Sequence, residues 1–151
     1  MTNVDTITLL NRLIVCSRNG EAALRAAASE VHHADLKQSL MEYSHFFADT
    51  AGEIQEVVRK MGGHPKGIGT FDNTLHRTLM HLKALIEGRN EMGILDTVES
   101  DEREADWCFD DACAHWETPP EIHAMLERQR DGAHMRHEAI RAMRMQMERM
   151  H

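Results

Sequence analysis

Apolar side chains recur three and four residues apart in four long stretches of the chain, with polar side chains between them. This spacing places the apolar residues of each stretch on one side of an α-helix, where they can pack against a neighbouring helix. The pattern predicts helices from about Asp5 to about His32, from just after Ala34-Asp35 to Met61, from about Glu91 to Trp116, and from Thr118-Pro119-Pro120 to the C-terminus.

The connections between these stretches predict how the helices pair. The first two stretches are separated by a very short connection, as are the last two, so each pair is expected to form an antiparallel hairpin. Residues from about 62 to 90 join the hairpins, and an apolar stripe from Leu75 to Ile86 predicts a short extra helix within them. Two hairpins joined by one long crossover predict an all-α, antiparallel ferritin-like four-helix bundle.

The composition supports one helical domain that spans residues 1–151. Aromatic residues make up 5% of the chain and prolines number 3, which argues against a β-sandwich. A net charge of -8 would repel phosphate backbones, so we expect no nucleic-acid partner. No apolar run approaches the roughly 18 residues of a membrane span, and the N-terminus lacks a basic, then apolar leader. We therefore expect a cytoplasmic protein with no membrane partner.

The three cysteines, Cys16, Cys108 and Cys113, form an odd set without a CxxC pair. Neither a disulfide framework nor a thiolate zinc site is indicated. The prediction is that they are small buried side chains.

Several short runs, taken in order along the chain, resemble a bacterial family of small ferritin-like bundle proteins whose function is unassigned. These runs are Leu9-Leu-Asn-Arg-Leu-Ile14 with Asn19-Gly20, Gly62-Gly63-His-Pro65, His76-Arg77, Glu99-Ser-Asp-Glu102, and Gln129 followed by His137-Glu-Ala-Ile-Arg141-Ala-Met-Arg144. The resemblance covers nearly the whole chain and implies the same fold. It implies no catalytic residues.

A di-iron site in such a bundle needs Glu-x-x-His pairs on inner helix faces. Two pairs occur, Glu30 with His33 and Glu42 with His45. Both fall off the apolar stripe of their helix, so we predict that they are solvated surface residues.

A second polar set lies within the apolar stripes, with His137 at the edge. This predicted polar core consists of Glu21, Glu102, Gln129 and Arg136. Because a buried charge is costly unless it is paired, we predict that Glu21 and Glu102 form an ion-pair network with Arg136.

Metal binding is the alternative interpretation of these inward polar residues. A divalent ion such as iron or manganese would be held by Glu21, Glu99, Glu102 and His137, with Glu53 as a possible fifth ligand. The final helix is also rich in methionine, including Met143, Met147 and Met150, for which core filling is favoured over a Cu(I) site.

No nucleophile with its base and no phosphate-binding loop is recognisable. The favoured function is therefore a non-catalytic bundle with no cofactor, assembled as a homo-oligomer such as a dimer, in a stress or housekeeping role. The alternative is a divalent-metal-binding or oxidase-like protein with a degenerate carboxylate site in its core.

Overall fold

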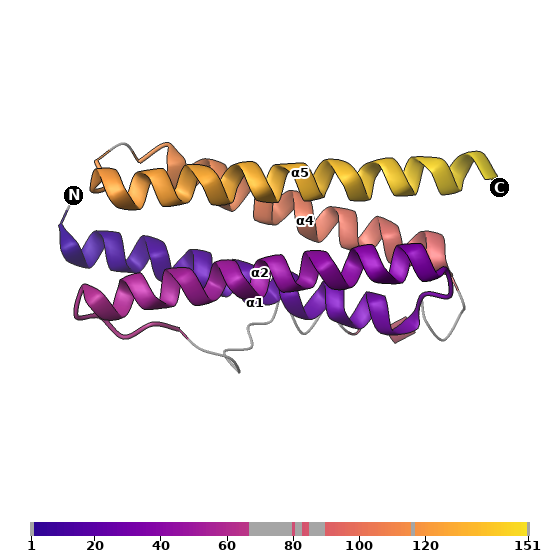
Figure 1. The fold of residues 1–151 in the computed structure, drawn as a ribbon, viewed down its shortest axis with the longest axis horizontal. Helices are drawn as coiled ribbons and strands as arrows, with labels where there is room; N and C mark the ends of the chain where they lie inside the picture. The colour runs from indigo at the N-terminus through magenta and orange to yellow at the C-terminus, as the bar shows by residue number, and fades with distance from the viewer. Residues whose placement is uncertain (1, 67–79, 81–82, 85–89, 116, 151) are drawn as a thin grey trace.

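The computed structural model describes residues 2–66, 80, 83–84, 90–115 and 117–150 (Figure 1). Within these ranges it contains four long helices and no strand, which confirms the all-α prediction. The helices are α1 (Asn3–Glu30), α2 (Ala34–Lys60), α4 (Glu91–Cys113) and α5 (Pro120–Met150). Each observed boundary lies within one helical turn of the predicted one. The predicted short helix between Leu75 and Ile86 falls largely outside the described residues.

Side chains at the helix starts satisfy the free backbone donors there. At the start of α1, the Thr2 hydroxyl accepts from Asp5 N at 3.2 Å while the Asp5 carboxylate accepts from Thr2 N at 3.1 Å, which makes a capping box. At the start of α4, Asn90 Oδ1 accepts from Gly93 N at 2.9 Å. Asp5 is therefore an acidic first-turn residue of α1.

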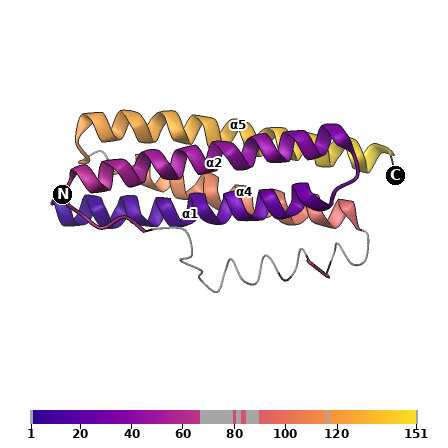
Figure 2. The same ribbon diagram turned by 60° about the horizontal axis from the view of Figure 1, so that its bottom comes forward.

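The four helices pack in two antiparallel pairs. α1 pairs with α2 and α4 pairs with α5, while α1 also packs on α4 and α2 on α5 (Figures 1 and 2). α2 ends beside the start of α1, whereas α4 begins beside the end of α1, where Glu91 Oε1 accepts from His32 N at 2.5 Å. This arrangement is compatible with a four-helix bundle.

The core contains the apolar stripe of every helix. Its largest fully buried side chains are Leu10, Leu13, Ile14 and Leu24 of α1, Leu40, Phe47 and Ile54 of α2, Ile94, Leu95 and Phe109 of α4, and Leu126 of α5. Burying one such side chain contributes about 1.5–3 kcal/mol, so the stripes supply most of the folding free energy. None of the described helices is long and apolar enough to cross a membrane.

The methionines of α5 divide into two groups. Met143 and Met147 are partly buried and pack against the core, as expected of core-filling residues. Met150 is 70% exposed, so its predicted inward position is wrong. The reason is that α5 projects past the ends of the other helices, which leaves Met150 with no core to face (Figure 1).

Two glycines inside helices differ in the space beside their Cα atoms. A Cβ at Gly20 would lie 3.5 Å from the Phe47 ring and 3.7 Å from Glu102 Oε1, which is ordinary contact. A Cβ at Gly132 would lie 2.7 Å from two ring carbons of Phe46. Of these two glycines, only Gly132 is therefore required by packing.

We expect Gly20→Ala to raise the free energy of unfolding by about 0.5–1 kcal/mol, because alanine lowers the entropy of the unfolded chain and favours helix. Gly132→Ala should instead lower it by about 1 kcal/mol, because overpacking against Phe46 outweighs the same gain. Urea unfolding of both variants measures this difference. Equal effects of the two substitutions would contradict the packing described here.

Candidate metal centre

Three carboxylates of α4 point into the bundle. Glu99, Glu102 and Asp106 are spaced three and four residues apart, so they lie on one face of the helix. Their exposed fractions are 4%, 1% and 9%. Each carboxylate has lost most of its contact with water, and the three differ in which groups, if any, replace it.

Asp106 meets two imidazoles of α5. Asp106 Oδ2 lies 3.1 Å from His134 Nδ1 and 3.2 Å from His137 Nδ1. The three residues each offer a ligand atom, and these atoms all lie within 4.8 Å of one another. His134 and His137 come to the same carboxylate because residues three apart on a helix share a face.

The cluster of Asp106, His134 and His137 has a buried side and a solvent-exposed side. The His137 side chain is 10% exposed and the His134 side chain 61%. Asp106 Oδ1 and His137 Nε2 are buried without a hydrogen-bond partner among the described residues. The cluster therefore has unused polar atoms on its inner side, where leaving them unpaired is costly.

The charge of Asp106 acts on His134. The hydrogen bond to Asp106, together with its negative charge, raises the pKa of His134 because the protonated imidazole is stabilised. No arginine or lysine forms an ion pair with Asp106 in the described part of the chain. Its negative charge is thus offset by imidazoles alone.

Glu102 lies deeper and has no hydrogen-bond partner. Both of its carboxylate oxygens are buried and unpaired in the region that the structure describes. Burial is the main cause that raises the pKa of Glu102 well above its ordinary value, and the charges of Asp101 and Asp106 add to it. The charge of Arg136 opposes this rise without cancelling it.

The predicted ion-pair network of Arg136 does not form. Arg136 Nη1 donates to the Gly132 carbonyl at 3.0 Å, and the guanidinium lies over the Phe46 ring, 3.8 Å from its centre. This cation–π contact holds the guanidinium against α2. Within the described residues, neither Glu102 nor Glu21 has an ion pair with it.

The other predicted metal ligands lie apart and are held by cations or amides. Glu21 forms ion pairs with Arg18 at 2.7 Å and with Arg25 at 2.9 Å. Glu99 forms ion pairs with Arg103 at 3.3 Å and with Arg144. Glu53 forms an ion pair with Arg128 and accepts a hydrogen bond from Gln129 Nε2 at 2.7 Å. A carboxylate bonded to guanidinium is a poor ligand for a further cation. Of the five predicted ligands, only His137 belongs to the cluster with Asp106.

Asp106 and His134 were not selected from the sequence. Counting along the hairpin would not have paired them, because Asp106 lies 7 residues before the end of α4 at Cys113 and His134 lies 14 residues after the start of α5 at Pro120. The exposed pairs Glu30 with His33 and Glu42 with His45 are surface residues, as predicted.

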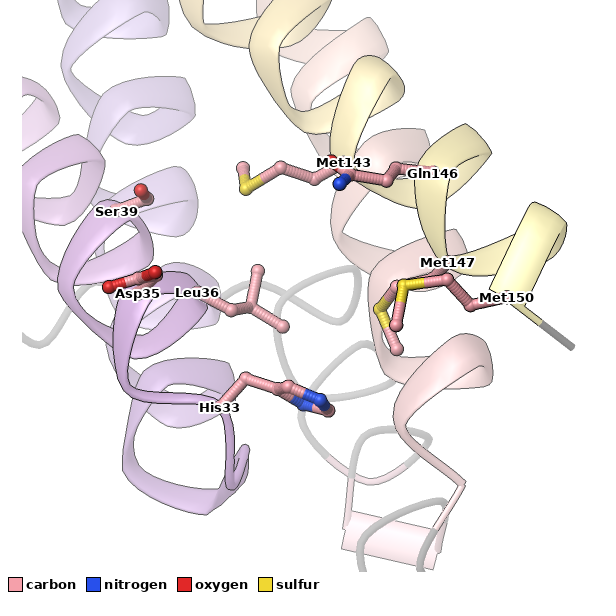
Figure 3. Close-up of a pocket in the computed structure, with 8 residues that line it drawn as sticks. All are labelled: His33, Asp35, Leu36, Ser39, Met143, Gln146, Met147 and Met150. Carbon is pink, nitrogen blue, oxygen red and sulfur yellow. The ribbon is translucent and has the colours of Figure 1, made fainter.

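A separate groove of about 460 Å³ lies between the start of α2 and the end of α5 (Figure 3). His33, Leu36 and Ser39 line one wall, and Met143, Met147 and Met150 are among the residues of the other. Figure 3 shows the side chains of Met147 and Met150 next to each other. His33 Nδ1 is held by Glu91 Oε2 at 3.0 Å.

Comparison with known families places this chain. The model of a domain of unknown function, DUF2383, matches residues 5–115, which is 111 of the 151 residues. The chain belongs to this family. The matched segment includes Asp106, whereas His134 and His137 lie beyond it on α5. A search of curated proteins gave no match.

Glu102→Gln should remove a pH-dependent loss of stability. The unfolded chain releases this proton near the ordinary glutamate pKa and the folded chain holds it to higher pH, so wild-type stability falls as pH rises between the two values. This sign is opposite to that of the predicted arginine pair. Urea unfolding should show similar stabilities at pH 4 and a variant more stable by at least about 1 kcal/mol at pH 7.

Glu99→Gln is the matched control on the same face of α4. It removes ion pairs to Arg103 and Arg144, so it should lower stability at pH 7 by about 1 kcal/mol or more. If Glu102→Gln also destabilised the protein at pH 7, Glu102 would have a partner that this structure lacks.

Proposed function

We propose that this protein binds one divalent cation through Asp106, His134 and His137. The observation that carries the proposal is the approach of one buried carboxylate and two imidazoles from adjacent helices, with all three ligand atoms within 4.8 Å. The unpaired Asp106 Oδ1 and His137 Nε2 support it, since a bound cation would turn the cluster so that these atoms gain partners.

The ligand set suggests which cation is bound. Two histidines and one carboxylate that leave positions open are typical of mononuclear Fe(II), and three protein ligands also suit Zn²⁺. Because the His134 side is exposed, water or a small molecule can occupy the open positions. We favour Fe(II), for which the open positions would allow contact with an oxidant.

The finer description of the fold belongs to the same proposal. We propose that the helices are connected as in ferritin-like bundles, a view supported by α2 and α4 running in the same direction (Figure 2). The cluster lies between α4 and α5 and holds one carboxylate, so we propose a single ion in place of a carboxylate-bridged pair. Assembly into a homodimer stays a prediction from the sequence.

The proposal is tested by titrating metal-free protein with Fe(II) without oxygen, and separately with Zn²⁺ and Mn²⁺, by calorimetry. Wild type should bind one ion per chain. Asp106→Asn and His134→Gln should each weaken binding by about 100-fold or more, because each removes a direct ligand. His134 is exposed, so its replacement leaves the core intact.

Asp110→Asn on α4 and His45→Gln on α2 are matched controls, because both side chains are exposed and outside the cluster. They should bind like wild type. The proposal fails if folded wild type binds none of the three ions stoichiometrically, or if binding survives Asp106→Asn unchanged.

A further inference from the structure

Two cysteines from different hairpins come together between α1 and α4. Cys16 Sγ and Cys108 Sγ lie 2.8 Å apart, although the residues are 92 positions apart in sequence. Both are free thiols and both are only partly buried. The prediction of small buried side chains is therefore wrong in part, because all three cysteines are only partly buried and two of them lie in contact.

The sulfur separation needs little change to become a covalent bond. A disulfide has an S–S distance of about 2.05 Å, so the two sulfurs have to approach by less than 1 Å. Their helices are already packed against each other. Partial exposure lets a small oxidant reach the pair, whereas a fully buried pair would exclude it.

We propose that Cys16 and Cys108 form a redox-active dithiol that a hydroperoxide oxidises to an intramolecular disulfide. With hydrogen peroxide, one sulfur attacks a peroxide oxygen and the O–O bond breaks; a sulfenic acid forms, and the leaving hydroxide takes the proton of that thiol to become water. The second sulfur attacks the sulfenic sulfur, the S–S bond forms, and the hydroxyl leaves as water with the second thiol's proton. With hydrogen peroxide, two thiols lose two electrons in total and the peroxide becomes two waters.

The disulfide would join the two hairpins covalently. In the reduced protein, the α1–α2 hairpin and the α4–α5 hairpin are linked by one chain connection and by packing. A cross-link between residues 92 positions apart restricts the unfolded chain strongly. Oxidation should therefore raise the thermal midpoint by on the order of 10 °C.

Cys113 provides an internal reference. It lies at the end of α4, is partly buried, and forms no sulfur contact with another cysteine in the described residues. A general reactivity of the thiols would oxidise it as well. The proposed site predicts that it stays reduced while the other two are consumed together.

The test uses the full chain in EDTA, so that no metal at Asp106 takes part. Reduced Cys113→Ser is treated with equimolar hydrogen peroxide, and its free thiols, intact mass and thermal midpoint are followed. We expect loss of both thiols, a mass lower by two hydrogens, a monomeric cross-link between Cys16 and Cys108, and the midpoint shift. Peptide mapping of oxidised wild type should leave Cys113 open to alkylation.

Cys16→Ser and Cys108→Ser are the matched single-thiol variants in the same background. They cannot form the bond, so at least one should accumulate a sulfenic acid that dimedone traps, with no rise in midpoint. Oxidation of the pair no faster than that of Cys113 in wild type would overturn the proposal. So would cross-links that form only between chains. Circular dichroism of each reduced variant checks that it is folded. If a variant is not folded, peptide mapping of oxidised wild type still tests the proposal.

Discussion

The desolvation of three carboxylates on one face of α4 is the constraint on which the polar interior depends. Removing an ionised group from water costs several kcal/mol unless other groups replace the water. Glu99 is compensated by arginines, Asp106 by imidazoles, and Glu102 by no hydrogen bond at all. The position of each residue along α4 decides which side chains contact its carboxylate, because each position faces a different part of α5 and α1.

The three carboxylate environments have different chemical consequences. A carboxylate held by guanidinium groups is a structural anion whose ligand positions are taken. A carboxylate held by imidazoles is different, because imidazoles give up protons near neutral pH and then act as metal ligands themselves. A carboxylate without partners avoids its charge by keeping its proton. One helix face thus carries an ion pair, a candidate cation site and a carboxyl group whose pKa is raised by burial, within two turns.

Helix positions were predictable because apolar periodicity is a local property of the sequence. Glu102 was also recognisable as buried, since it lies on a stripe otherwise made of apolar residues. That it lacks a hydrogen-bond partner among the described residues was not predictable. Arg136 was assigned to it because the two residues were expected at the same height along the bundle. Height alone does not determine the direction in which a long side chain extends. In the structure the Arg136 guanidinium packs on the Phe46 ring.

The contact between Cys16 and Cys108 could not be predicted from the sequence for a related reason. A short turn limits the register within each hairpin, although counting equal steps from the turn between α4 and α5 does not align Asp106 with His134. No such turn joins α1 to α4. Their register is set by packing between hairpins, which requires coordinates.

The two histidines of the cluster also differ in how they exchange protons with water. His137 is enclosed between helices, so its ring N–H should exchange slowly enough to give a resolved proton signal in magnetic resonance spectra. His134 faces solvent, and its ring N–H should exchange too fast to be seen. A single pair of residues on one carboxylate thereby reports separately on the interior and the surface of the protein.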